Sequence, residues 1–281
     1  MPTYTEAFQS LRAALQPLYD AGESAAIARM FLQQTTGFSY TQGIARDTPI
    51  PPLTAGMIAR GQEELVKGRP VQYVLGRAEF LGQSFLVDER VLIPRPETEE
   101  LVSWIVEEWK GQQNLVITDV GTGSGCIPVS LSLEITGATV YTCDVSAPAL
   151  ELARQNSERL EARVRFAQLD FLQRDEWQKL KPSHVIVSNP PYILDSEVLH
   201  PNVRDHEPSV ALFVPGTDPL VFYRALADFG KNYLLSGGAI YCETHSDHGE
   251  PTKAVFTDAG YSDVVLRKDL DGRDRMIRAR I

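Results

Sequence analysis

The sequence has 281 residues, of which 43% are hydrophobic and 23% charged, as in a soluble globular protein with one large or two modest domains. Its net charge of -10 argues against a general binder of nucleic-acid phosphates, which needs a basic face. Three widely spaced cysteines predict no disulfide framework. With no basic signal-peptide start and no membrane-length apolar run, we expect a cytoplasmic protein with no membrane partner.

The first part of the chain has the pattern of a small helical unit. Apolar residues recur at helical spacing from Tyr4 to Leu18. Ser24 is a candidate cap for a second helix, and Thr54 for a third. We therefore predict a helical domain over residues 1–72.

A different pattern follows and predicts a β-hairpin linker over residues 73–96. Phe80 and Phe85 flank the four residues Leu-Gly-Gln-Ser, a combination typical of a hairpin. Pro94 and Pro96 then end the extended segment, because proline cannot donate to a sheet ladder.

Beyond the linker, strand and helix patterns alternate, which predicts an α/β domain over residues 97–281. The predicted strands are 115–120, 138–144, 164–170, 184–189 and 239–244, followed by two near the C-terminus that join through Asp271-Gly272. This is a mostly parallel, seven-stranded, doubly wound sheet with a closing hairpin.

A glycine-rich loop follows the first of these strands. Its residues are Gly121, Thr122, Gly123, Ser124 and Gly125. Three glycines at alternate positions let a ligand approach the backbone, where a tight turn alone would need only one or two. The dinucleotide fingerprint would require glycine where Cys126 stands. The loop therefore predicts a nucleotide-like cofactor.

Acidic residues end the next two strands. Asp144 lies 21 residues beyond Gly123, where a carboxylate accepts hydrogen bonds from both ribose hydroxyls of an adenosine. Asp170 and Phe171 end the following strand, and an acid beside an aromatic ring suits an adenine. Phe171 suits an ordinary core position equally well.

The sequence Ser-Asn-Pro-Pro-Tyr ends the fourth strand with a rigid turn. Asn189 and the carbonyl of Pro190 are both acceptors, and together they can take two hydrogen bonds from one NH2 group. Pro191 stiffens the turn, and Tyr192 can form a wall against the flat group that carries the NH2. Such a grip aims a weakly nucleophilic nitrogen at an electrophile held across the crevice. We expect these four residues to bind the substrate, with Asn189, Pro190 and Tyr192 catalytic and Asn189 also near the cofactor.

These motifs resemble the Rossmann-like class I methyltransferases, and a longer match narrows the family. GRPVQYVLGRAEFLGQSFLVDERVLIPRPETE, VRDHEPSVAL and KDLDGRDRMIRA are similar to segments of the protein-(glutamine-N5) methyltransferases that modify peptide chain release factors. The resemblance covers nearly the whole chain.

The resemblance implies that S-adenosyl-L-methionine is the methyl donor and S-adenosyl-L-homocysteine the product. Its substrate would be the glutamine of a Gly-Gly-Gln motif in a release factor, docked partly by the helical domain. The glycine loop would bind the methionine part of the donor, Asp144 the ribose, and Asn189 to Tyr192 the substrate amide. Ser124 stands where the family usually has threonine, and Phe171 where it usually has tryptophan. We expect a monomer with no stable nucleic-acid partner.

Several alternatives stay open. The Asn-Pro-Pro-Tyr turn also occurs in nucleic-acid adenine N6-methyltransferases, which act on a flipped base, although the acidic balance counts against one. A non-catalytic cofactor-binding protein is a second alternative. We predict no metal, because Cys242, His245 and His248 lack an obvious fourth ligand.

Two further groups have two interpretations each. Four residues around Pro96 could shape the pocket, or their acids could simply favour a helix N-terminus; they are Arg95, Glu97, Thr98 and Glu99. Arg204 and Glu207, in the long segment after the Asn-Pro-Pro-Tyr turn, could border the substrate entrance or lie in a solvated loop.

Overall fold

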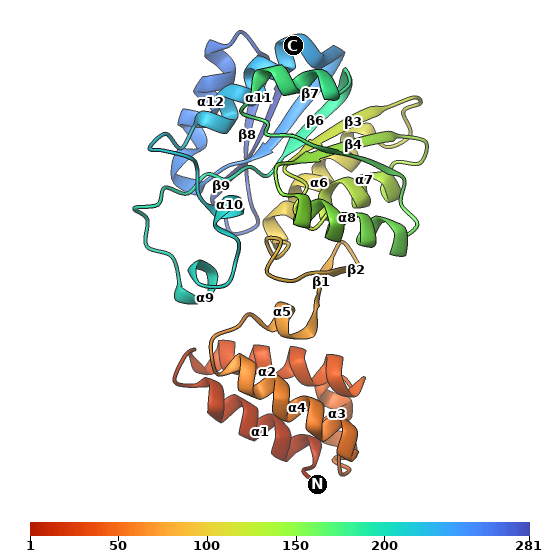
Figure 1. Cartoon of the computed structure of the whole chain (residues 1–281), viewed down its shortest axis with the longest axis vertical. Coiled ribbons are helices and arrows are strands. Elements are labelled where there is room, and N and C mark those ends of the chain that lie inside the picture. The colour runs from red at the N-terminus through yellow and green to blue at the C-terminus, as the bar shows by residue number, and fades with distance from the viewer. The chain divides into compact units, whose positions relative to one another are not determined.

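The computed structural model describes residues 1–281, which divide into two compact units (Figure 1). The helical unit comprises Met1–Arg77 and Leu199–His206. The sheet unit comprises Ala78–Val198 and Glu207–Ile281. Most of the segment predicted as a linker therefore belongs to the sheet unit.

The segment 199–206 lies in the helical unit, although its place in the sequence put it within the predicted α/β domain. The ring of His200 stacks on Tyr19, with the centroids 6.4 Å apart. Asn202 Nδ2 donates a hydrogen bond to the hydroxyl of Tyr19. These contacts join residues about 180 positions apart, and no local pattern indicates them.

The helical unit consists of six helices, and all but α9 (Pro201–Arg204) contribute residues to or pack against one apolar core. They are α1 (Tyr4–Leu15), α2 (Ala21–Thr36), α3 (Tyr40–Arg46), α4 (Pro52–Leu65), α5 (Val71–Leu75) and α9. Asp20 caps α2, because its Oδ1 accepts hydrogen bonds from the backbone N–H groups of Gly22 and Glu23. Ser24, the predicted cap, lies instead in the first turn and is buried.

The hairpin of the sheet unit lies where the sequence predicts one. Strands β1 (Arg77–Phe80) and β2 (Gln83–Leu86) pair through a turn at Leu81 and Gly82, both with positive φ. The rings of Phe80 and Phe85 are fully buried and meet edge to face, with centroids 6.0 Å apart.

The sheet has seven strands in the order β5-β4-β3-β6-β7-β9-β8. The first five run parallel, and β9 lies antiparallel to both β7 and β8. The strands are β3 (Val116–Val120), β4 (Thr139–Asp144), β5 (Val164–Gln168), β6 (Ser183–Ser188), β7 (Leu234–Glu243), β8 (Ser262–Lys268) and β9 (Asp274–Arg280). The mostly parallel, seven-stranded sheet predicted from the sequence is confirmed.

Helices cover both faces of this sheet (Figure 1). One face carries α6 (Pro96–Trp109), α7 (Cys126–Glu134) and α8 (Ala147–Arg159), and the other carries α11 (Val221–Tyr233) and α12 (Gly249–Asp258). Alternate residues of β6 enter the two cores: Val185 and Val187 face α6 and α7, while Ile186 faces α11. No helix has both the length and the apolar character needed to cross a membrane.

The parallel strands bring distant motifs to one edge of the sheet. Because β3, β4, β6 and β7 run in the same direction, their carboxyl ends meet there. The glycine loop follows β3, Asp144 ends β4, the Asn-Pro-Pro-Tyr turn follows β6, and Glu243 ends β7. Open α/β sheets bind ligands at this edge.

Candidate active site

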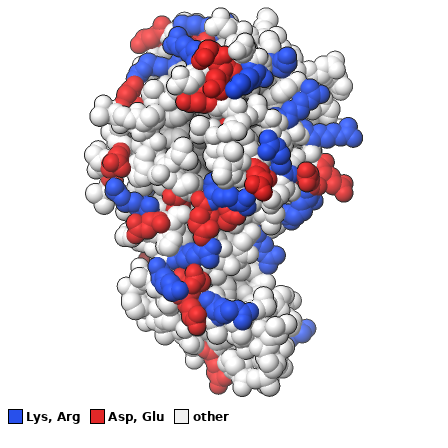
Figure 2. Space-filling model, viewed as in Figure 1, with Lys and Arg blue, Asp and Glu red and all other residues white.

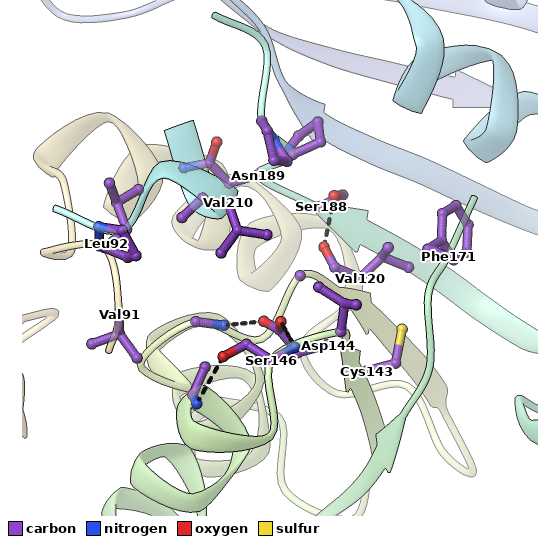
Figure 3. A pocket seen from close by; sticks show the side chains of 18 of the residues that line it. Val91, Leu92, Val120, Cys143, Asp144, Ser146, Phe171, Ser188, Asn189 and Val210 are labelled. Carbon is purple, nitrogen blue, oxygen red and sulfur yellow. Dashed lines mark hydrogen bonds between the residues drawn. The ribbon is translucent and has the colours of Figure 1, made fainter. Parts of the chain in front are cut away.

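A pocket of about 790 Å³, open to solvent, lies at this edge (Figure 3). Its walls come from the ends of β3, β4 and β6, from residues 90–92, and from the segment around α10 (Ser209–Leu212). Of the residues proposed from the sequence, the pocket is lined by Gly121, Gly123, Asp144, Asp170, Phe171, Asn189, Pro190 and Pro191.

The glycine loop depends on left-handed backbone at each of its glycines. Gly121, Gly123 and Gly125 have φ of 89°, 52° and 83°. A Cβ on Gly125 would lie 3.1 Å from the Cβ of Ala153, whereas one on Gly123 would meet no atom within 4 Å. The loop therefore packs tightly on α8 at one glycine and leaves open space at another.

The side chains of Thr122 and Ser124 are buried and do not line the pocket. The hydroxyl of Thr122 lies 2.6 Å from that of Thr142, which donates a hydrogen bond to Asp119 Oδ2, also at 2.6 Å. The Oγ of Ser124 is buried without a hydrogen-bond partner. Any contact of these two residues with a cofactor would therefore run through the backbone.

Asp144 is held in place by the backbone around it. Its Oδ2 accepts a hydrogen bond from Gly123 N at 3.0 Å, and its Oδ1 accepts one from Ser146 N at 2.9 Å (Figure 3). Burial raises the pKa of this carboxyl, and the two N–H groups oppose that shift. A carboxylate has about four acceptor sites, so capacity remains for a ligand.

Phe171 combines the two predicted roles, because it is a core residue that also lines the pocket. Its ring lies 5.6 Å from Trp177 and 5.3 Å from Phe229, centroid to centroid. Trp177 Nε1 also donates a hydrogen bond to the Phe171 carbonyl at 2.8 Å. Asp170 turns back on its own loop and accepts a hydrogen bond from Leu172 N at 3.0 Å.

Three hydrogen bonds hold the Asn-Pro-Pro-Tyr turn and the serine before it. Ser188 Oγ donates to the carbonyl of Val120, at the end of β3, at 2.7 Å. Asn189 Nδ2 donates to Thr98 Oγ1 at 3.1 Å. The Tyr192 hydroxyl donates to Glu243 Oε1 at 3.2 Å, and Tyr192 is not among the pocket-lining residues.

Sequence reasoning did not single out two buried acids at this edge. Asp119 is fully buried, and its Oδ1 has no hydrogen-bond partner. Burial raises the pKa of Asp119 well above the usual aspartate range. Glu243 is 2% exposed. An acid at the carboxyl end of an otherwise apolar strand was the available signal for both.

The possible metal ligands and Glu207, which the sequence also singled out, lie outside the pocket lining. Cys242 is fully buried in β7, His245 and His248 lie beyond the strand end, and no group of three potential metal ligands gathers there. Glu207 is buried rather than solvated, since it accepts hydrogen bonds from Arg95 and from Ile93 N.

The family model "Methyltransferase small domain" matches residues 98–204. A release factor glutamine methyltransferase of Bacillus subtilis is 36% identical and covers 98% of this chain and 97% of its own length. One of Bacteroides thetaiotaomicron is 44% identical, over 76% of this chain and 77% of that protein.

The chain belongs to the release factor glutamine methyltransferase family. Solved structures of low identity show the same fold. A methyltransferase of Pyrococcus furiosus is 16% identical, with a TM-score of 0.51 over 79% of this chain and 98% of that chain. A 16S rRNA methyltransferase of T. thermophilus, in complex with AdoMet and guanosine, is 14% identical, with a TM-score of 0.52 over 73% of this chain and 49% of that chain. The predicted Rossmann-like methyltransferase fold and the family resemblance are both confirmed.

Proposed function

We propose that this protein transfers a methyl group from S-adenosyl-L-methionine to the side-chain amide N5 of the glutamine in the Gly-Gly-Gln motif of peptide chain release factors. The observation that carries the proposal is the match to a relative named for this activity over 98% of the chain. The pocket adds support, because it joins a glycine loop to an asparagine turn at one edge of the sheet.

The residues present fit the donor. The ionised carboxylate of Asp144 retains acceptor sites for ribose hydroxyls. Gly121 and Gly123 line the pocket and let a ligand approach the loop. Phe171 offers one wall for a flat ring. When bound, the donor supplies an electrophilic methyl group on a sulfonium.

The asparagine turn acts on the acceptor nitrogen. Asn189 uses its amide N–H on Thr98, which leaves Oδ1 as its acceptor. With the Pro190 carbonyl, Oδ1 can take both hydrogen bonds of a glutamine NH2. These bonds orient the nitrogen and increase its electron density. As the new N–C bond forms, the S–C bond of the donor breaks and leaves S-adenosyl-L-homocysteine. The nitrogen loses one proton to solvent during or after transfer, so the turn needs no strong base.

A nucleic-acid adenine N6-methyltransferase is less well supported. Its substrate would require a continuous basic surface. On the face shown in Figure 2, Lys and Arg side chains are interspersed with Asp and Glu. The net charge is -10, and the relatives from Bacillus subtilis and Bacteroides thetaiotaomicron are named for release factors.

A labelling experiment tests the proposal. The protein is incubated with donor carrying a labelled methyl group and with three separate acceptors: a purified release factor, the same factor with its motif glutamine changed to alanine, and a DNA duplex. We expect label only on the unmodified release factor. Label on the duplex alone, or equal label on the two release factors, would contradict the proposed methylation of the motif glutamine.

A further inference from the structure

Both polar side chains of the Asn-Pro-Pro-Tyr turn end at one buried carboxylate. Tyr192 donates directly to Glu243 Oε1 at 3.2 Å. Asn189 reaches the same carboxylate through Thr98: its Nδ2 donates to Thr98 Oγ1 at 3.1 Å, and Thr98 Oγ1 donates to Glu243 Oε2 at 2.7 Å. Thr98 and Glu243 are each 2% exposed, so water does not compete for these bonds.

The chain of hydrogen bonds has a direction. An ionised carboxylate only accepts, so the single hydroxyl proton of Thr98 is used on Glu243. Thr98 then offers Asn189 only lone pairs, and Asn189 must turn its NH2 group toward them. The opposite orientation would bring the amide oxygen against another acceptor. The network therefore determines which end of the Asn189 amide is left for the substrate.

We propose that Thr98 and Glu243 are positioning residues that hold the Asn189 amide with its oxygen toward the acceptor nitrogen. The inference rests on the proposed methyl transfer to an amide. Neither residue needs to touch donor or substrate. Their effect is on transfer, and donor binding does not depend on them.

Protonation of Glu243 would reverse the donor and acceptor roles in the hydrogen bonds that join Glu243, Thr98 and Asn189. A protonated Glu243 can donate to Thr98, which frees the threonine proton for the Asn189 oxygen and favours the wrong orientation. The groups around this carboxylate are Thr98 and Glu97 of α6, Tyr192, Arg275 of β9, and Tyr223 of α11, whose hydroxyl donates to the Glu243 carbonyl. Burial and the charge of Glu97 raise the pKa of Glu243, while Thr98, Arg275 and Tyr192 oppose the rise. Transfer should therefore fall as pH decreases through that raised pKa.

The test compares Thr98→Val, Thr98→Ser and Glu243→Gln with the wild-type protein, using release factor as acceptor. We expect Thr98→Val to lower kcat by about 10- to 100-fold, whereas removing the direct acceptor with Asn189→Ala should cost on the order of 10²- to 10³-fold. Thr98→Ser keeps the hydroxyl and should recover most of the rate. Thr118→Val is the matched control. It also removes a buried threonine hydroxyl, but that hydroxyl is hydrogen-bonded to Ser183, and neither residue lines the pocket.

Three readouts separate positioning from a general loss of structure. Calorimetry should give the same donor affinity for wild type, Thr98→Val and Glu243→Gln. The acid-side fall of kcat should be present in wild type and absent in Glu243→Gln, which stays neutral at every pH. The NMR signals of the Asn189 side-chain NH2 should shift in Thr98→Val and not in Thr118→Val.

The experiment distinguishes a failure of the positioning role from a failure of the proposed methyl transfer. An inactive wild-type protein would refute the proposed transfer itself. An active wild type with full kcat in Thr98→Val, or with an unchanged acid limb in Glu243→Gln, would overturn the positioning role alone.

Discussion

At the scale of single residues, we propose that Asp144 binds the donor ribose, and the backbone already holds its side chain in position. Two backbone N–H groups hold its oxygens, one from the glycine loop and one from the start of α8. The same burial that fixes the side chain raises its pKa. The carboxylate must nevertheless be ionised to accept two ribose hydroxyls, so donor affinity should depend on pH.

We predict that donor affinity is greatest above the pKa of Asp144 and falls as acidification protonates it. Because that pKa is raised, the fall begins at a higher pH than for an exposed aspartate, whose pKa is about 3.9. Asp144→Asn should bind the donor about 10- to 100-fold more weakly, as expected for losing one to two charge-assisted hydrogen bonds. Calorimetric titrations with S-adenosyl-L-homocysteine over a pH series measure both effects. A pH dependence that is the same in the variant would show that another group is responsible.

At the scale of elements, the glycine loop joins β3 to α7 through three left-handed residues that have different surroundings. Gly125 packs against Ala153 of α8, and Gly123 faces open space. Gly125 therefore matters for the packing of the loop, and Gly123 leaves space for a ligand.

We predict that Gly125→Ala lowers the free energy of unfolding by about 2–3 kcal/mol, from left-handed strain plus the crowding at Ala153. Gly123→Ala is the matched control and should cost only about 1 kcal/mol of stability, from strain alone. It should weaken donor binding, because its new methyl group projects into space a ligand would use. Thermal unfolding and calorimetry measure the two effects. Equal stability losses would contradict the different packing of the two glycines.

At the scale of the whole molecule, the segment after the Asn-Pro-Pro-Tyr turn belongs to the helical unit over residues 199–206. The chain thus passes between the units three times, after residues 77, 198 and 206. We propose that the helical unit docks the release factor, as the family resemblance implies. It carries exposed apolar side chains on α4, including Leu53 at 78% and Met57 at 47% exposure, which are one helical turn apart.

We predict that intact release factor is methylated with a kcat/KM on the order of 10²-fold higher than a short Gly-Gly-Gln peptide, since remote contacts contribute binding energy. Leu53→Ser with Met57→Ser should raise KM for the intact factor and leave the peptide reaction unchanged. Leu270→Ser, which removes a side chain 92% exposed in the sheet unit, is the control. Steady-state kinetics on both substrates decides the matter. Equal efficiency on peptide and intact factor would exclude a docking role.

Local sequence patterns were sufficient to predict most of the helices and strands of the sheet unit. The alternation of strand and helix patterns predicted the five parallel strands, and Ser146 caps α8 as expected, since its Oγ accepts a hydrogen bond from Ala149 N at 3.2 Å. They were weaker in the helical unit, where the short helices α3 and α5 were not predicted. There the cap of α2 was misassigned by four residues, because both Asp20 and Ser24 are good capping types.

The sequence by itself determined the alternating α/β order, the glycine loop and the Asn-Pro-Pro-Tyr turn, because each depends on backbone preferences of neighbouring residues. Only the tertiary structure decided that Tyr192 and Asn189 share the carboxylate of Glu243, and that Tyr19 holds residues 199–206. Those partners are 51 to 183 positions apart along the chain. Contacts of that kind follow from strand order and side-chain packing, and no local periodicity encodes them.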